Sequence, residues 1–453
     1  MRRVPASVRG LSARFVPEGA ALLAALIFGS YVMGLVRDRM FARTFGAGTE
    51  LDAYNAAFVL PELLLDVLVE AGLAAPFIPI FLQLRARGDG AEGDRFARTI
   101  LSGAVTVMGV AAVLMFIFAE ATTSLIAPGF TGDQRELYVS LFRVMLVTPI
   151  LFAASLTLGQ VLLAEQRFFW YGIAPLLYNG GIIVGTVAFS DALGIYGPAI
   201  GAVIGAIIHL ASRFIGLRGS RFRVRFGWDG GTPAVREFVR LMVPKMVSHP
   251  VEPMTFLFFT AVASSLAAGS VTAVSFARNF QSVPVSLVGV AFALAVFPAL
   301  STAHATGDRR GFLRLLWTNL AIITVVTVAS AIGLIVLGDV AIRVLLGGGA
   351  FGDRDVALVA TTLAAFALSV PFESISHLLS RAIYATRHTI LQVLASLAGL
   401  GITVAATLLL VDDAGILAIP LGFTIGQAGK TGLLALALLV RLRTIRETGE
   451  LGG

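Results

Sequence analysis

The chain has 453 residues, of which 57% are hydrophobic and only 13% are charged, and its mean hydropathy is +0.88. Soluble domains carry about 25% charged residues, so this composition excludes an ordinary soluble protein. A bilayer accepts such an apolar surface, and the chain is therefore predicted to be an integral membrane protein. Cysteine is absent, which excludes disulfides, a thiol nucleophile and a cysteine-bound metal.

Apolar stretches of membrane length recur from one end of the chain to the other. About 20 residues cross the hydrocarbon core as a helix. Twelve spans are predicted: Gly19–Val36, Ala53–Leu84, Thr99–Ala119, Val144–Ala164, Phe168–Ser190, Leu193–Ser212, Val235–Leu266, Val271–Ala303, Leu315–Gly338, Val356–Tyr384, His388–Val411 and Gly415–Val440. The predicted fold is an all-α polytopic membrane protein of about twelve transmembrane helices. The first apolar run is expected to be a retained span, since no small-residue cleavage site follows it.

The basic residues predict an orientation. The net charge of +7 often indicates nucleic-acid binding, but membrane proteins also gather Lys and Arg on cytoplasmic loops. With a cytoplasmic N-terminus, most of the 34 basic residues fall in cytoplasmic segments. We therefore expect both termini to face the cytoplasm and no nucleic-acid partner.

The longest cytoplasmic loop divides the predicted spans into two sets of six. We expect an N-terminal six-helix lobe at 1–215, a cytoplasmic linker at 216–234 and a C-terminal six-helix lobe at 235–453. Transporters commonly contain such internal repeats. The basic linker fits either a solvated connection or a segment that binds anionic lipid headgroups.

Acidic residues interrupt the second span. Glu62, Asp66 and Glu70 follow one another at four-residue intervals, which places them on one helical stripe. They either lie in water at a helix end or line a water-filled cavity, since charges inside spans usually face an interior path. Pro61 and Pro76 predict that this span is bent or broken.

Arginines stand next to polar residues in the first and eighth spans. Arg37 precedes Asp38, and Arg278 is followed by Asn279 and Gln281. A guanidinium makes bidentate contacts with phosphate or pyrophosphate. Arg278 could instead extend to the membrane surface.

Prolines also surround Glu252 in the seventh span. Broken spans of this kind often mark a transport site or a hinge.

Several blocks of the sequence resemble the MurJ/MviN lipid II flippases. The first is Gly-Leu-Val-Arg-Asp-Arg-Met-Phe-Ala-Arg-Thr-Phe-Gly-Ala-Gly at 34–48, followed by Asp-Ala-Tyr at 52–54. Further matches are Ala-Ala-Gly-Ser-Val at 267–271 and Leu-Ser-Arg-Ala-Ile-Tyr-Ala-Thr-Arg-His-Thr at 379–389. The resemblance runs in order over about residues 20–440.

This resemblance implies two six-helix lobes around a central cationic cavity. It also implies transport of lipid II, an undecaprenyl-pyrophosphate-linked cell-wall precursor, across the bacterial cytoplasmic membrane. The candidate substrate-binding residues are Arg37, Arg278, Asn279 and Gln281. The candidate gating or cation-coupling residues are Asp38, Asp52, Glu62, Asp66, Glu70 and Glu252. The implied partners are the lipid-linked glycan, membrane lipids and cell-wall synthesis enzymes.

The chain departs from the family pattern in its arginines. Tyr31 and Glu62 stand where the family usually has Arg and Asn, and Leu65 replaces another Arg. The family usually reads Ala-Asp-Arg where this chain has Arg278 one residue earlier, a shift of about 100° around a helix. Alternative functions are therefore export of another lipid-linked oligosaccharide or a cationic drug, or a transport-dead membrane scaffold. No Walker, HExxH or GxSxG motif is present, so we expect no enzyme, no cofactor and no metal.

Overall fold

The computed structural model describes residues 19–70, 73, 76–87, 90–248, 251–386 and 389–448. Within these ranges the chain is helical and forms no β-strand, only an isolated bridge between Gly348 and Phe351. The predicted all-α class is confirmed. Residues 1–18 and the side chain of Glu70 lie outside the described part.

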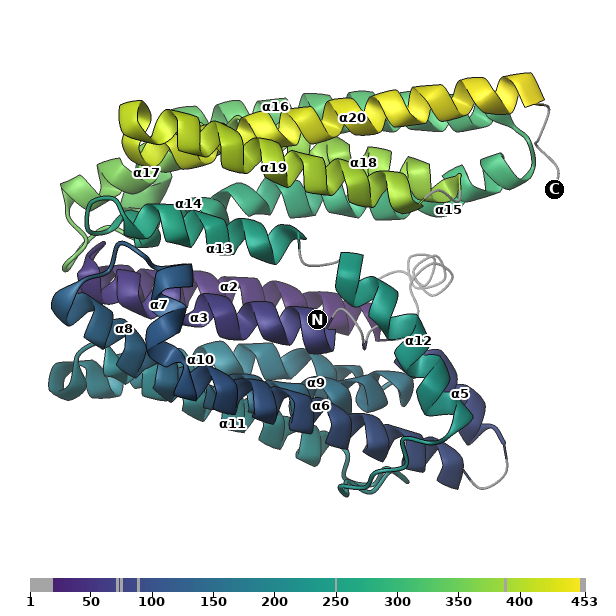
Figure 1. Cartoon of the computed structure of the whole chain (residues 1–453), viewed down its shortest axis with the longest axis horizontal. Coiled ribbons are helices and arrows are strands. Elements are labelled where there is room, and N and C mark those ends of the chain that lie inside the picture. The colour runs from purple at the N-terminus through teal and green to yellow at the C-terminus, as the bar shows by residue number, and fades with distance from the viewer. Residues whose placement is uncertain are drawn as a thin grey trace, which may run out of the picture. The chain divides into compact units, whose positions relative to one another are not determined.

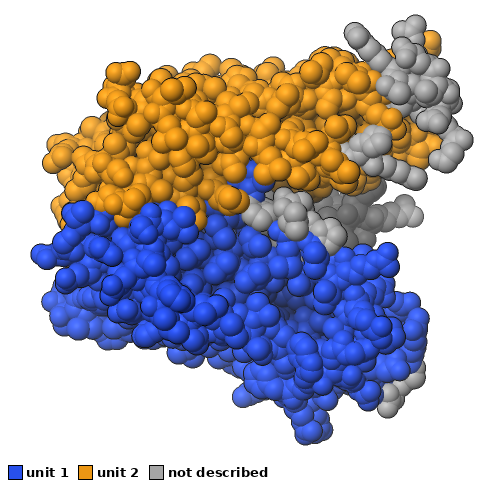
Figure 2. All heavy atoms as spheres, in the orientation of Figure 1, with its two compact units in different colours: residues 1–45, 53–126, 130–253 blue, residues 46–52, 127–129, 254–453 orange. Residues whose placement is uncertain are grey.

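The chain divides into two compact units, coloured separately in Figure 2. Unit 1 falls within Met1–Phe45, Ala53–Ile126 and Phe130–Pro253, and unit 2 within Gly46–Asp52, Ala127–Gly129 and Met254–Gly453. Two short segments of the first half thus belong to unit 2. The predicted boundaries at 215 and 235 stay a prediction, and α12, which begins at Pro233, belongs to unit 1.

The helices of the first half begin with one long helix and a second helix that passes into a π-helix (Figure 1). Their bounds are α2 Ala20–Phe45, α3 Thr49–Leu65, the π-helix η1 Asp66–Glu70, α5 Phe77–Arg85, α6 Ala91–Ile117, α7 Ala119–Ile126, α8 Gly132–Met145, α9 Val147–Ala164, α10 Phe168–Leu193, α11 Tyr196–Gly216 and α12 Pro233–Ser248.

The second half ends in a long helical hairpin, α19 and α20, which lie side by side in Figure 1. The bounds here are α13 Val251–Ser264, α14 Ser270–Pro284, the π-helix η2 Val285–Val290, α15 Ala291–Ala305, α16 Arg309–Leu345, α17 Asp353–Ala367, α18 Val370–Ala385, α19 Thr389–Ala414, the 3-10 turn η3 Gly415–Leu417 and α20 Ala418–Thr448.

Eight helical segments of the described chain are long and apolar enough to cross a membrane; α17 and α18, bent by 42°, add a ninth if the pair is counted as one span. One of the eight, Thr389–Leu442, contains both helices of the α19–α20 hairpin. The polytopic membrane class is confirmed, whereas the count of twelve stays a prediction. In the second predicted span α3 passes into the π-helix η1, and α5 is a separate element; residues 71, 72, 74 and 75 between them lie outside the described part, so the break stays a prediction.

Glycines allow α10 and α11 to pack backbone against backbone in unit 1. Gly181 and Gly185 on α10 face Gly201 and Gly205 on α11. A Cβ added to Gly181 would lie 2.4 Å from the Cα of Gly205, and one added to Gly185 would lie 2.4 Å from the Cα of Gly201. Apolar helices gain no hydrophobic energy by associating in lipid, so close van der Waals contact of this kind holds them together.

The helices α19 and α20 of unit 2 also pack closely, with threonines on α19 opposite glycines on α20. A Cβ on Gly422 would lie 2.1 Å from Oγ1 of Thr407, and one on Gly426 would lie 1.9 Å from Oγ1 of Thr403. In each unit, therefore, two helices approach so closely that the contact requires small residues.

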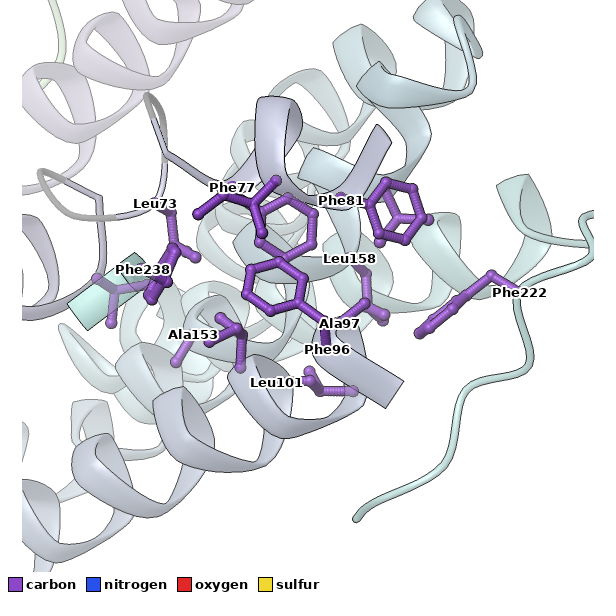
Figure 3. Close-up of a cluster of buried hydrophobic side chains, with 14 of the residues drawn as sticks. Leu73, Phe77, Phe81, Phe96, Ala97, Leu101, Ala153, Leu158, Phe222 and Phe238 are labelled. Atoms are coloured by element: carbon purple, nitrogen blue, oxygen red, sulfur yellow. The ribbon is translucent and has the colours of Figure 1, made fainter. Parts of the chain in front are cut away.

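An aromatic cluster closes the end of unit 1 where α5 and α6 meet. Phe77 stacks on Phe81 at 5.6 Å and lies 5.5 Å from Phe96 on α6. Figure 3 shows Phe238 of α12 and Phe222 of the segment after α11 on either side of Phe96. The non-helical segment between α11 and α12 is thus fixed to the helices by a buried ring.

Substitution of Gly201 tests the α10–α11 contact. We expect Gly201→Leu to lower the thermal unfolding temperature in detergent, since an added Cβ would lie 2.8 Å from the carbonyl oxygen of Gly181. Overpacking of this kind costs roughly 1–3 kcal/mol. Gly109→Leu on α6 is the matched control, because nothing lies within 4 Å of its added Cβ. Equal unfolding temperatures for the two variants would contradict the close contact.

Candidate functional site

Arg37 lies at the centre of a polar cluster in unit 1. Its Nε and Nη2 donate to Oδ1 of Asp38 at 3.1 and 2.8 Å, and its Nη1 donates to Oδ1 of Asn179 on α10 at 3.2 Å. The Arg37 side chain is 28% exposed, whereas that of Asp38 is only 9% exposed. The Arg37 guanidinium is therefore oriented by two partners, and the side chain as a whole is partly exposed.

Aromatic rings and one acid surround this cluster. The Arg37 guanidinium lies 5.9 Å from the Phe41 ring, which packs edge-on against Tyr54 at 5.1 Å. The carboxylate of Glu62 is close enough to interact electrostatically with Tyr54 and Tyr178. Glu62 itself is exposed. The structure thus places Arg37, Asp38 and Glu62 in one neighbourhood of unit 1.

A second arginine of unit 1, Arg213 on α11, is buried at 2% exposure. Its Nη1 donates to the carbonyl oxygens of Trp170 and Tyr171 at 2.6 and 2.8 Å. Pro175 has no N–H for the carbonyl of Tyr171, four residues earlier in α10, so this oxygen lacks its helical donor. Within the described part of the chain no carboxylate pairs with Arg213, and backbone oxygens solvate its charge instead.

Sequence reasoning did not assign Arg213 to the predicted site. The signal that could have found its role was the proline inside the fifth predicted span. A proline in a helix frees a carbonyl, and a nearby Arg can satisfy that carbonyl.

In unit 2, Arg278 forms a buried ion pair with Glu373 of α18. Nη1 lies 2.9 Å from Oε2, and Nη2 lies 2.7 Å from Oε1, so the pair is bidentate. Gln281 accepts from Nη1 of Arg278, and its Nε2 donates to Glu373 at 2.9 Å and to Ser369 at 3.1 Å. Arg278, Gln281 and Glu373 are exposed by 5%, 0% and 7%.

Two aromatic rings enclose this ion pair. The Arg278 guanidinium lies 5.5 Å from the Phe256 ring and 5.0 Å from the Phe423 ring. The geometry places Arg278 and Gln281 inside the protein with their hydrogen-bonding groups occupied. Asn279, the third predicted binding residue of α14, is exposed.

Glu373 was missing from the predicted site, although a carboxylate after a proline in an apolar span was a visible signal. A carboxylate in a span requires a cation, and Arg278 supplies it across 95 residues of chain.

Asp52 accepts three hydrogen bonds at the start of α14. Gly269 N donates to Oδ2 at 2.7 Å, while Thr272 N and Thr272 Oγ1 both donate to Oδ1 at 2.7 Å. The first N–H groups of a helix have no intrahelical acceptor and carry a partial positive charge. A buried carboxylate from a segment 217 residues earlier therefore caps α14.

Two glycines with positive φ make this approach possible. Gly46 has φ +67° and Gly269 has φ +91°, a region that costs little only for glycine. A Cβ on Gly269 would lie 2.5 Å from the carbonyl oxygen of Ala47, and one on Gly46 would lie 2.8 Å from that of Ala350. The turn before α3 is thus packed against the turn before α14, all within unit 2.

The remaining predicted acids occupy three separate places. Asp66 is half-buried where η1 begins, Glu252 is exposed in the first turn of α13, and the side chain of Glu70 lies outside the described part. A π-helix has more residues per turn than an α-helix. The simple α-helical stripe predicted for Glu62, Asp66 and Glu70 therefore does not continue unchanged through η1.

A family model described as "Lipid II flippase MurJ" matches residues 41–449 of this chain. The chain belongs to this family. It is accordingly a multi-pass protein of the bacterial inner membrane.

Curated members of the MurJ family match over most of the chain. The probable lipid II flippase MurJ of Thermotoga maritima is 29% identical over 89% of this chain and 79% of its own length. The corresponding protein of Rickettsia prowazekii is 24% identical over 91% of this chain and 82% of its own length.

Solved structures show the same fold. A lipid II flippase MurJ in an inward closed conformation matches with TM-score 0.79 and 24% identity, over 94% of this chain and 93% of its own. A multidrug resistance MATE transporter in an inward-facing conformation matches with TM-score 0.78 and 14% identity, over 92% and 96%. At these identities the likeness establishes the architecture alone.

The Arg278–Glu373 pair yields a test that separates packing from substrate binding in this MurJ-family chain. We expect Arg278→Met alone to destabilise the protein by roughly 3–5 kcal/mol, because it leaves Glu373 buried and unpaired. The double variant Arg278→Met/Glu373→Leu should recover most of the unfolding temperature measured in detergent. A double variant that is as unstable as the single one would show that the unpaired charge of Glu373 is not the cause of the instability.

The Asp52 cap yields a second test. Asp52→Ala removes three accepted hydrogen bonds, so we expect faster hydrogen exchange at the Gly269 and Thr272 amides and a loss of roughly 1–3 kcal/mol. Glu50→Gln, an exposed acid two residues earlier, is the matched control for lost charge. Unchanged exchange at 269–272 in Asp52→Ala would show that the carboxylate does not hold this end of α14.

Proposed function

We propose that the chain translocates lipid II, an undecaprenyl-pyrophosphate-linked cell-wall precursor, across the cytoplasmic membrane by alternating access. The observation that carries this proposal is the family match, which extends over residues 41–449. The relatives named as lipid II flippases and the fold shared with MurJ and MATE transporters support it. The protein then moves its substrate without changing a covalent bond, and it is a transporter and not an enzyme.

Arg37 is the proposed contact for the pyrophosphate. Its side chain is partly exposed, and Asp38 and Asn179 hold the guanidinium in a defined orientation. A planar guanidinium binds phosphate oxygens through paired charge-assisted hydrogen bonds. In this proposal Asp38 neutralises Arg37 until an anionic headgroup takes its place, which gives Asp38 a gating role.

The three predicted binding residues of α14 have different roles in this proposal. Asn279, which is exposed on α14, remains a headgroup contact. Arg278 and Gln281 support that helix from inside, because Glu373 already occupies their donors. Arg278 would contact substrate only in a conformation in which its pair with Glu373 has opened.

Carboxylates carry the proposed gating. The cap that Asp52 forms on α14 is the candidate gate contact, since its release would free one helix end. We propose Glu62, Asp66, Glu70 and Glu252 as further gating or cation-coupling groups. The proposal also includes cytoplasmic termini and cell-wall synthesis enzymes as suppliers of the lipid-linked substrate.

A second candidate function is export of another lipid-linked oligosaccharide or of a cationic drug. The observation that favours it is the absence of polar and cationic residues that the family usually has in the first two spans. Tyr31, Glu62 and Leu65 replace polar or cationic residues that the resembled family usually has, and both Tyr31 and Glu62 are exposed.

Complementation of a flippase-depleted bacterium tests the proposed function. We expect wild type to restore growth, Arg37→Lys to restore it less well and Arg37→Ala to fail. Losing a charge-assisted hydrogen bond weakens substrate binding by roughly 10- to 100-fold. Arg135→Ala, an exposed arginine on α8, is the control, and immunoblotting of membranes shows equal insertion.

Two outcomes would redirect the assignment. Rescue by Arg37→Ala would remove Arg37 from the binding site. Failure of well-inserted wild type would contradict lipid II as the substrate, and loss of cationic-dye efflux in Glu62→Gln would then support the drug exporter.

A further inference from the structure

The segment between α11 and α12 runs without helix along the first turns of α6 in unit 1. Nε of Arg98 donates to the carbonyl oxygen of Arg223 at 3.2 Å. The Gly227 amide donates to Oγ of Ser102 at 3.0 Å, and the Asp229 amide donates to Oγ1 of Thr99 at 3.2 Å. These bonds give residues 221–229 a fixed position against α6.

Side chains alternate along this segment as they do in any extended chain. Phe222 is 3% exposed inside the aromatic cluster of Figure 3, and Val224 packs partly against the same cluster. Arg221, Arg223 and Arg225 point away from it and are exposed. Among the described residues, no carboxylate forms a salt bridge with any of these three arginines.

The alternation continues beyond the cluster with two uncovered aromatic rings. Phe226 is 72% exposed and Trp228 is 73% exposed. A Cβ built on Gly103 of α6 would lie 3.4 Å from Cζ3 of Trp228, so the indole lies directly on α6 at Gly103. Large rings of this kind bury apolar area only if a further apolar phase covers them.

The position of Gly103 on α6 indicates that lipid is the apolar phase that covers these rings. Charged residues of α6 end at Arg98, and none occurs between Thr99 and Ala119. On the face of α6 that continues from Gly103, Val107, Val110 and Leu114 are 49%, 56% and 51% exposed. This exposed apolar face belongs in lipid, and Trp228 lies where it begins.

We propose that residues 221–228 form an interfacial anchor that binds anionic phospholipid headgroups. Trp228 and Phe226 insert at the boundary between headgroups and acyl chains, where aromatic rings are favoured in membrane proteins. Arg221, Arg223 and Arg225 are exposed at the alternate positions of the same segment and bind the phosphates of phosphatidylglycerol-like lipids. The anchor is independent of which substrate the protein carries.

Fluorescence of Trp228 tests the insertion. The chain has three tryptophans, so Trp170→Phe/Trp317→Phe leaves Trp228 as the single emitter in full-length protein. In nanodiscs, we expect acyl-chain-brominated lipids to quench its emission strongly and aqueous acrylamide to quench it weakly. Strong acrylamide quenching with little effect of brominated lipid would overturn the proposal, because Trp228 would then face water or a soluble partner.

Lipid selectivity tests the arginines. In wild type we expect spin-labelled phosphatidylglycerol to associate more strongly than spin-labelled phosphatidylcholine. Arg221→Ala/Arg223→Ala/Arg225→Ala should reduce that preference by roughly fivefold per arginine removed. The corresponding triple Lys variant is the matched control and should keep most of the preference.

Two controls separate alternative causes. Unchanged unfolding temperature of the triple Ala variant in phosphatidylcholine nanodiscs shows that it is folded, as expected for side chains without salt-bridge partners. Inorganic phosphate at matched ionic strength should not displace the lipid, because a free ion lacks the bilayer that holds the rings. A lipid preference that is equal in wild type and the triple Ala variant, or that free phosphate abolishes, would overturn the anchor.

Discussion

Solvation of guanidinium groups inside an apolar helix bundle is the constraint on which this structure depends. A charge removed from water is strongly destabilising unless a partner replaces the water. The chain solves this in three ways. Asp38 and Asn179 orient Arg37 and leave it partly exposed, helix carbonyls next to Pro175 solvate Arg213, and Glu373 neutralises Arg278. Of these three arginines Arg37 is the most exposed, which is why it is the one proposed to bind an external anion.

Much of the architecture could be predicted because the bilayer restricts what a chain can do. Hydropathy alone indicates helices, since lipid leaves no other partner for backbone groups, and proline marks where those helices break. Pro76 directly precedes α5, whereas Pro61 lies inside α3 without interrupting it. The Arg37–Asp38 contact was also foreseeable, because the two residues are neighbours in sequence.

Long-range pairing could not be predicted in the same way. The partners of Arg278 and Asp52 lie 95 and 220 residues away, and helical periodicity contains no information about which distant helix packs nearby. The burial of Arg278 could not be predicted either. An Arg that binds a ligand and an Arg that binds an internal carboxylate look the same in sequence.

The π-helical segment η2 separates the two halves of the eighth predicted span. A π-turn accommodates one more residue than an α-turn, so helix on either side of it can have its own rotational phase. Pro284 begins this change, and Gly289 within it allows the backbone of Ser374 to come close, with 2.7 Å from an added Cβ to Cα. Arg278 lies on the α14 side of η2, and the buried face of α15 lies on the other side. The sequence can therefore change on one side of η2 without changing the helix packing on the other side.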